Sequence, residues 1–334
     1  MTLLLTYLLI FILAILAAYH LRGIIRAEEA KLVPLLVIIP SSLKRGQAPL
    51  SKGSIPLPDQ ELSEELYKRL QKQRVPFSIE AVVQSVGEEI SFYLSVNKKY
   101  QKKVTQLIKS LWPTAYVDEA DSYEPWATID EAGSEATILT TVTLSKPYGL
   151  PLKTRSTTRH NQDSFAPVLE CLAKLKTVGE SAIIQWIVRP ANPGLLRDLG
   201  TVIASLEQGD YKTNNHIHNQ FLLTKHNLPI LKEKVGSPLL AANCHILVHA
   251  QSESRAEQIT NELTQALCDL SSGDNYNQLQ ANQPKNQTNA VTTFLDHRFI
   301  ESNELIISAR ELAGAFHLSG FSPRLASAKR GQTP

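Results

Sequence analysis

The chain has 334 residues, of which 43% are hydrophobic, and its formal net charge at pH 7 is +2. This composition excludes a wholly disordered chain and a general binder of polyanions. About 300 residues follow an apolar amino terminus, and that length indicates about two domains rather than one small core.

The amino-terminal segment is the first predicted element. Residues 1–19 carry no charged side chain, and Arg22, Arg26 and Lys31 follow. A helix of about 20 apolar residues crosses a hydrocarbon core roughly 30 Å thick. Because basic residues prefer the cytoplasmic side, residues 1–21 are predicted to be a transmembrane anchor in the cell membrane. The chain is then single-pass, with its amino terminus outside and its bulk in the cytoplasm.

Two other interpretations of this segment are open. A cleaved secretory signal would need a basic region before the apolar run, and none precedes it. A buried helix of a soluble protein would need a polar face, whereas nearly every face here is apolar. The retained anchor explains the flanking charges best.

The first domain is predicted over residues 32–123. Apolar residues alternate with polar ones in its strands and recur every three or four residues in its helices. The predicted elements are a strand at 35–39, a helix from Asp59, a hairpin at 77–83 and 90–96, a helix at 104–111 and a strand at 115–120.

The second domain is predicted over residues 136–284 and repeats the same order. An insertion at 191–238, with one amphipathic helix and a His- and Asn-rich stretch, interrupts it. The other predicted elements are a strand from Ile138, a helix at 165–172, strands at 182–188 and 240–248, a helix from 254 and a strand at 276–281. Residues 285–334 are expected to form a C-terminal helix and a basic tail.

The repeated strand-helix-strand-strand-helix-strand order predicts an α+β protein with two ferredoxin-like units after the anchor. In this architecture two helices cover one face of a four-stranded antiparallel sheet, and the other face is expected to stay open for a partner. The fold does not decide the function, because many unrelated proteins share it.

Sequence motifs for catalysis and cofactor binding are missing. No Gly-Lys dipeptide of a phosphate loop and no Gly-x-Ser-x-Gly elbow occurs. Two histidine pairs, His216 with His218 and His245 with His249, lack acidic or thiol partners at ligand spacing, so they are expected to be surface residues. Cys171, Cys244 and Cys268 are expected to be reduced core thiols of a cytosolic protein. We therefore predict no catalytic residue, cofactor or metal.

A basic group begins the second helix of the first unit. Lys98, Lys99, Lys102 and Lys103 lie within six residues. Such a group can contact lipid phosphates or the backbone of DNA. The alternative is a solvated helix face, since a charge run is often only that.

Several segments resemble the amino-terminal, non-ATPase region of membrane-anchored conjugative, type IV secretion-like ATPases. The resemblance runs from about Leu32 to Leu318. The segments that carry it are 36–40, 77–80, 89–96, 111–113, 116–123, 152–154, 179–190 and 307–318.

In that family, the segment that resembles Ser308 to Leu318 leads into the motor domain. Here a basic tail to Pro334 follows instead, so the resemblance implies an ATPase that is encoded separately or lost. It also implies a partner-docking segment, whose residues would be Ser308, Glu311, Leu312 and Phe316.

The function expected from the sequence is a membrane-anchored, non-catalytic scaffold or docking module of a conjugation or type IV secretion-like machine. Its expected partners are the membrane and either a separate ATPase or further copies of the chain. Two alternatives are a ligand- or metal-binding protein that uses the His-rich insertion, and a nucleic-acid-binding module that uses the Lys-rich helix.

Overall fold

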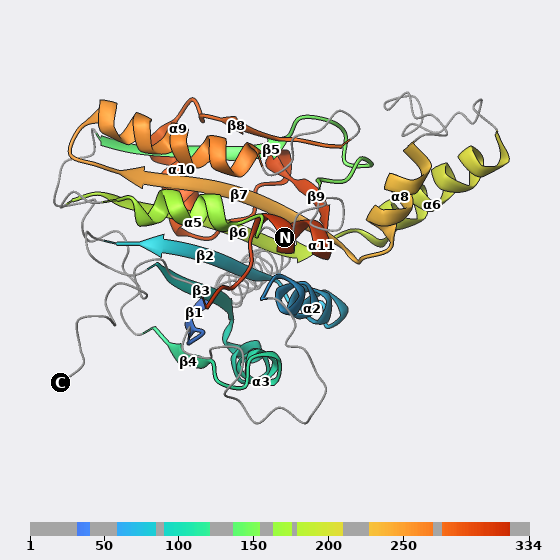
Figure 1. Cartoon of the computed structure of the whole chain (residues 1–334), viewed down its shortest axis with the longest axis horizontal. Coiled ribbons are helices and arrows are strands. Elements are labelled where there is room, and N and C mark those ends of the chain that lie inside the picture. The colour runs from blue at the N-terminus through green and yellow to red at the C-terminus, as the bar shows by residue number, and fades with distance from the viewer. Residues whose placement is uncertain are drawn as a thin grey trace, which may run out of the picture.

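The computed structural model describes residues 32–40, 59–84, 90–120, 136–153, 163–175, 179–209, 227–269 and 276–320. These residues form an α+β fold in which nine strands make one antiparallel sheet and eight α-helices pack around it (Figure 1). The predicted anchor at 1–21 lies outside them, as do His216 and His218. None of the described helices combines the length and the apolarity that a membrane span requires.

The first unit has the predicted order of elements. Its strand order is β4-β1-β3-β2, and each neighbouring pair is antiparallel. The elements are β1 (Leu32–Ile38), α2 (Asp59–Lys72), β2 (Phe77–Val83), β3 (Ser91–Asn97), the short 3-10 helix η1 (Lys98–Tyr100), α3 (Gln101–Leu111) and β4 (Tyr116–Glu119).

The second unit has the same connectivity, with the strand order β6-β7-β5-β8. Its elements are β5 (Thr137–Leu144), α5 (Ala166–Ala173), β6 (Ser181–Pro190), β7 (Leu239–His249), α9 (Glu253–Asp269) and β8 (Leu279–Asn282). The insertion contributes α6 (Pro193–Gln208) and α8 (Leu228–Val235) between β6 and β7. These two helices project from the body of the molecule (Figure 1).

The two units are joined edge to edge. Strand β2 pairs antiparallel with β6 along its whole length, from Phe77 opposite Val188 to Val83 opposite Ala182. The predicted domains are thus two halves of one continuous sheet. The central pair of this seam is Glu80 opposite Gln185.

One face of the sheet is apolar and carries the main core. Side chains alternate along a strand, so Ile79 and Ala81 of β2 point into this core, which also contains Leu66 of α2 and Phe165 next to α5. Helices α2, α3, α5 and α9 all contribute buried side chains to the same cluster. The helical stripes seen in the sequence therefore converge on a single interior.

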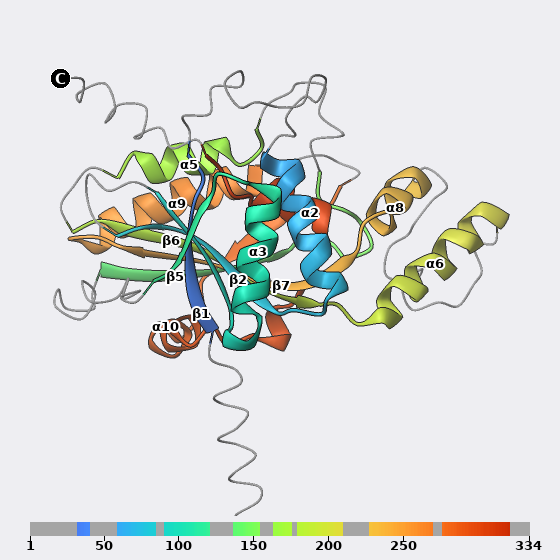
Figure 2. The same cartoon turned by 90° about the horizontal axis from the view of Figure 1, so that it is seen from below.

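The opposite face is not left open, contrary to the expectation from the sequence. Helix α10 (Gln287–Leu295) packs there, on the other side of the sheet from α5 and α9 (Figure 2). Its Phe294 is buried against Val82 and Leu247. The Gln287 side chain both donates to and accepts from the backbone of Leu139, at 3.1 and 2.9 Å, and so fixes α10 to β5.

The segment from β9 (Leu305–Ser308) to residue 320 belongs to the interior of the fold and does not form a tail. Strand β9 pairs with β7, and helix α11 (Ala309–Ala315) follows and packs against α2. The expected docking residues Ser308, Glu311, Leu312 and Phe316 are all at most 2% exposed. They build the chain's own core, so the expectation that they receive a partner is corrected.

Candidate functional site

The most unusual polar group in the interior lies on the seam between the two units. We call Ser78, Glu80, Gln185 and His297 the seam cluster. The Glu80 Oε1 atom accepts hydrogen bonds from Ser78 Oγ at 3.0 Å, from Gln185 Nε2 at 3.0 Å and from His297 Nε2 at 2.6 Å. Glu80 is fully buried, and a buried carboxylate is tolerated only with such donors.

The position of Glu80 follows from the strand pattern. Phe77, Ile79 and Ala81 take the apolar face, so Ser78 and Glu80 face the side of α10. The antiparallel join then sets Glu80 opposite Gln185. His297 comes from the turn directly after α10 and adopts a left-handed φ of 49°, which directs its ring back towards the seam.

The charge state of His297 follows from its neighbours. Its Nε2 faces the Glu80 carboxylate and its Nδ1 faces the Leu295 carbonyl at 3.2 Å. Both partners accept hydrogen bonds only, so both ring nitrogens carry protons. Burial lowers the pKa of His297, but the Glu80 charge and these hydrogen bonds raise it more, and the net shift is upward. The seam therefore holds a buried imidazolium–carboxylate pair.

A second histidine on the same face, His245, has a lowered pKa in contrast to His297. His245 lies opposite Gln185 in the β6–β7 ladder. Its ring packs edge to face against the Phe294 ring, with the two ring centroids 6.0 Å apart. Among the described residues, its Nδ1 and the Oε1 of Gln185 have no hydrogen-bond partner. Burial lowers the pKa of His245 to about 4, so this ring is neutral near pH 7. His245 and His249 are both buried, which corrects the expectation of surface histidines.

We expect His245→Leu to change the acid stability of the chain. The folded-state pKa of His245 is about 4, below its ordinary 6.5, so its neutral form stabilises the fold above pH 6.5 and this contribution is lost as pH falls towards 4. A shift of this size is worth about 3 kcal/mol. Urea unfolding measured at several pH values should therefore show that the free energy of unfolding falls less from pH 7 to pH 4 in the variant than in the wild type. An equal fall in the free energy of unfolding of the two proteins would contradict the lowered pKa of His245.

A second buried polar group joins the insertion to the C-terminal segment. We call Lys234, Glu311 and Ser308, with the backbone that they contact, the joint cluster. Lys234 Nζ lies 3.2 Å from Glu311 Oε1 and donates to the Ile306 carbonyl at 2.9 Å. Burial lowers the pKa of Lys234, and Glu311 opposes that shift. Both side chains are 1% exposed, so each neutralises the other away from water.

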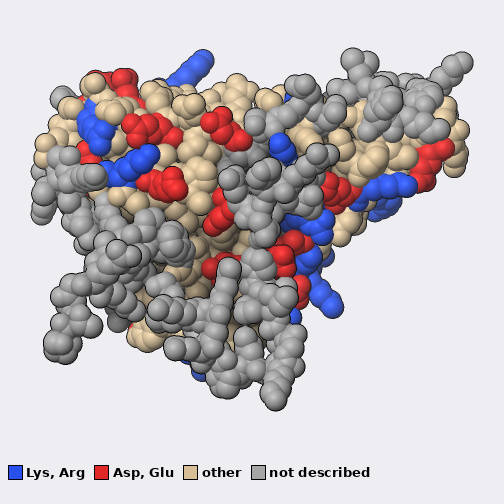
Figure 3. Space-filling view, in the orientation of Figure 1, with Lys and Arg blue, Asp and Glu red and all other residues tan. Residues whose placement is uncertain are grey.

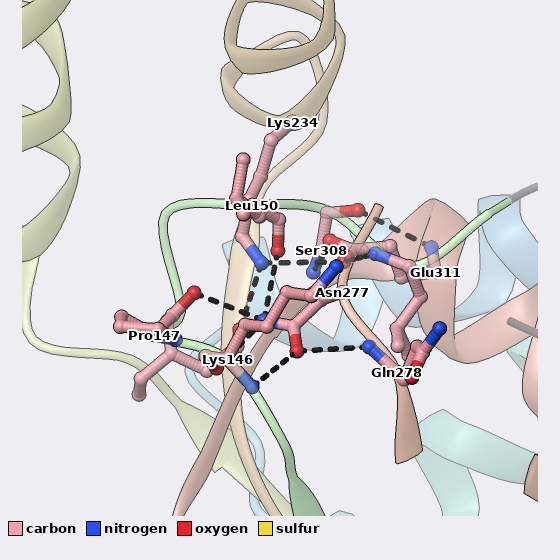
Figure 4. Close-up of polar contacts among 10 residues, drawn as sticks. Lys146, Pro147, Leu150, Lys234, Asn277, Gln278, Ser308 and Glu311 are labelled. Atoms are coloured by element: carbon pink, nitrogen blue, oxygen red, sulfur yellow. Dashed lines mark hydrogen bonds and ion pairs between the residues drawn. The ribbon is translucent and has the colours of Figure 1, made fainter. Parts of the chain in front are cut away.

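Glu311 has two further roles in the joint cluster. It closes a capping box with Ser308 at the start of α11, in which Glu311 Oε2 accepts from Ser308 N at 2.7 Å. Its Oε1 also accepts from Leu152 N at 2.6 Å. One carboxylate thus connects α8, β9 and the segment after β5, which Figure 4 shows converging.

Asn277 fixes the neighbouring loop. Its amide donates to the carbonyls of Lys146, Pro147 and Leu150, and its Oδ1 accepts from the backbone of Lys146 and Gln278 (Figure 4). This fully buried side chain replaces the backbone partners that a regular strand would have supplied. The loop after β5 is thereby bound to the residues directly before β8.

The arrangement of both clusters indicates that they stabilise the fold. Their charged groups are buried and hydrogen-bonded to segments distant in sequence, so they hold the two units, the insertion and the C-terminal segment in one arrangement. Neither cluster is predicted by the sequence patterns. The only available signals were a glutamate in an alternating strand and the Ser308-x-x-Glu311 spacing.

The structure also shows where the predicted lysines and cysteines lie. Lys98, Lys99, Lys102 and Lys103 are exposed on η1 and α3. Cys171, Cys244 and Cys268 are free thiols, of which Cys244 is buried and the other two are partly exposed. Within the part of the chain that the structure describes, no group of three potential metal ligands occurs. His216 and His218 of the metal alternative lie outside that part.

Comparisons with known proteins add little. No protein-family model matches the sequence, and no curated protein matches it. Among solved structures, the chain is similar to a heme-binding protein from Thermus thermophilus, at 9% identity and a TM-score of 0.17. The match covers 79% of this chain and 94% of that chain. A TM-score this low carries no argument about function, so heme binding is not transferred.

Proposed function

We propose that this chain is a non-catalytic, membrane-anchored scaffold of a conjugation or type IV secretion-like machine. In this proposal two ferredoxin-like units form one rigid body that the segment 1–21 holds at the cytoplasmic face of the membrane. The apolar amino terminus with its flanking basic residues and the family resemblance of residues 32–318 support it. A scaffold needs a rigid body and an accessible edge for pairing.

The observation that carries the proposal is that β4 is an edge strand with exposed apolar side chains beside it. Among the described residues this strand pairs only with β1 and ends the sheet. Tyr116 is 56% exposed and lies opposite Ile38, which is 44% exposed. Two large apolar side chains thus lie together beside an edge strand, where another strand can pair.

The backbone of β4 is suited to such pairing. Ala120 N donates to the Pro34 carbonyl at 3.0 Å. Hydrogen bonding alternates along an antiparallel ladder, so the N–H groups of Val117 and Glu119 point away from β1. The Glu119 N–H donates to Asp118 Oδ1 at 3.0 Å, so an added strand would pair first at Val117 and would have to displace that side chain at Glu119. The β2–β6 seam shows that these units already associate through strand edges. We infer that β4 recruits the separate ATPase or a second copy in the same way.

Tyr116→Lys should weaken this association about tenfold, because a lysine on an edge strand opposes strand addition. The measurement is the recovery of the motor ATPase, and of differently tagged copies of the chain, from detergent-solubilised membranes. Leu196→Lys is the matched control, since Leu196 is also 44% exposed but lies on α6. Equal recovery with both variants would overturn the role of β4.

A deletion of the C-terminal residues cannot test docking. Removal from Ser308 onwards would take away the buried β9–α11 connection and the carboxylate of the joint cluster. Loss of partner recovery would then report unfolding. The surface substitution on β4 avoids this ambiguity.

A further inference from the structure

Four exposed lysines lie at the end of the sheet where the described chain begins. We call Lys98, Lys99, Lys102 and Lys103 the lysine patch. Leu32, the first described residue, lies opposite Asn97 in the β1–β3 ladder. The lysine patch starts at the next residue after Asn97. The described chain therefore begins beside this patch.

The fold presents these lysines outward. Asn97 Oδ1 accepts from Lys99 N at 3.1 Å and caps η1, and Lys99 Nζ lies 5.1 Å from the centroid of the Tyr100 ring. In α3 the buried residues are Val104, Leu107 and Ile108, so Lys102 and Lys103 are on the solvent side.

The charge of the lysine patch is not neutralised among the described residues, where no ion pair includes any of its members. The neighbouring Glu119 binds the Gln101 amide at 2.7 Å instead. Cations at a helix start are also disfavoured by the helix dipole. Elsewhere, on the face shown in Figure 3, acidic and basic side chains are interspersed. An external anion would compensate this concentration of positive charge.

The chain length limits where that anion can be. Residues 22–31 separate the predicted anchor from Leu32, and ten extended residues span at most about 35 Å. If residues 1–21 are embedded, the entry end of the sheet stays within this distance of the headgroups. Anionic lipids of the cytoplasmic leaflet then provide the nearest dense negative charge, and their attraction extends over about 8 Å.

We propose that the lysine patch contacts the phosphate headgroups of anionic lipids and turns this end of the sheet towards the membrane. The inference rests on the proposed anchor and adds an orientation to it. Each basic residue near an anionic surface strengthens association about fivefold. Lys109, at the other end of α3, lies about 9 Å further along the helix axis than Lys103, so in the proposed orientation it is further from the membrane.

The test is lysine footprinting of the full chain reconstituted in lipid nanodiscs. Acetylation rates are compared by mass spectrometry between discs of phosphatidylcholine alone and discs that also contain phosphatidylglycerol. We expect at least about threefold slower acetylation of the lysine patch in the anionic discs, with high salt reversing the effect. Lys72, Lys109 and Lys285, which are exposed elsewhere, should react at equal rates in both.

A pair of variants sharpens the result. Lys102→Gln with Lys103→Gln should reduce the protection of Lys98 and Lys99, whereas the control Lys72→Gln with Lys109→Gln should leave it unchanged. Equal acetylation in both kinds of disc, with the chain embedded, would overturn the lipid contact and leave the anchor intact. Failure of the chain to enter discs would overturn the anchor and this inference together. Protection by duplex DNA, and not by anionic lipid, would assign the lysine patch to nucleic acid instead.

Discussion

Lys234→Met is expected to lower the free energy of unfolding by about 3–5 kcal/mol, because it leaves the Glu311 carboxylate buried without its counter-charge. It also removes the hydrogen bond to the Ile306 carbonyl. Methionine fills a similar volume, so little of the loss comes from a cavity. The measurement is urea unfolding of the full chain in detergent, followed by tryptophan fluorescence, to which the buried Trp112 and Trp186 contribute.

Lys232→Met is the matched control for this substitution. Lys232 lies two residues earlier on α8 and pairs with Glu207 at 2.5 Å, but its side chain is 53% exposed. An exposed ion pair contributes little, so this variant should stay within about 1 kcal/mol of the wild type. A similar small loss for Lys234→Met would show that the joint cluster does not hold the insertion and the C-terminal segment together.

The second large effect is expected at the seam cluster. His297→Asn should cost about 3 kcal/mol at pH 6, since it removes the cationic partner of the buried Glu80. Asparagine tolerates the left-handed φ of 49° at this position, so the turn after α10 is kept. The loss then reports the missing ion pair and not a strained backbone.

The cost of His297→Asn should also depend on pH. The folded-state pKa of His297 is raised above its ordinary 6.5, so its stabilisation is complete below pH 6.5 and is lost as pH rises through the folded-state value. The difference between wild type and variant should therefore shrink towards pH 9. Urea unfolding of both proteins at pH 6, 7.5 and 9 measures it. The acid titration of His245 occurs in both and cancels in the difference.

Arg298→Met provides the control at the adjacent position. Arg298 pairs with Asp296 at 3.0 Å on the surface, where the two side chains are 68% and 50% exposed. We expect a loss within about 1 kcal/mol and no comparable pH trend. A pH-independent loss for His297→Asn would argue against an imidazolium at the seam.

Local patterns in the sequence were sufficient to predict the main elements. In β2 the alternation of Phe77, Ile79 and Ala81 with polar neighbours predicted both the strand and its apolar face, because side chains alternate along any strand. The recurrence of apolar residues every three or four positions similarly predicted the helix from Asp59, where Leu66 and Leu70 are buried in α2. The repeated order of elements then gave the α+β class and the connectivity within each unit.

The clusters could not be predicted in this way. Glu80 and His297 are 217 positions apart in the chain, and Lys234 and Glu311 are 77 apart. Their contacts depend on the β2–β6 seam and on β9 pairing with β7, and neither pairing leaves a periodic signal. The docking role expected for Ser308, Glu311, Leu312 and Phe316 came from the family resemblance, which carries no information on burial.

The sequence by itself thus determined which segments are strands and helices and which of their faces are apolar, since these properties repeat every two or every 3.6 residues. Tertiary structure alone decided that the two units share one sheet, that α10 covers its second face and that the C-terminal segment is core. The physical reason is that these outcomes depend on long-range pairing and desolvation, which involve residues far apart in the chain.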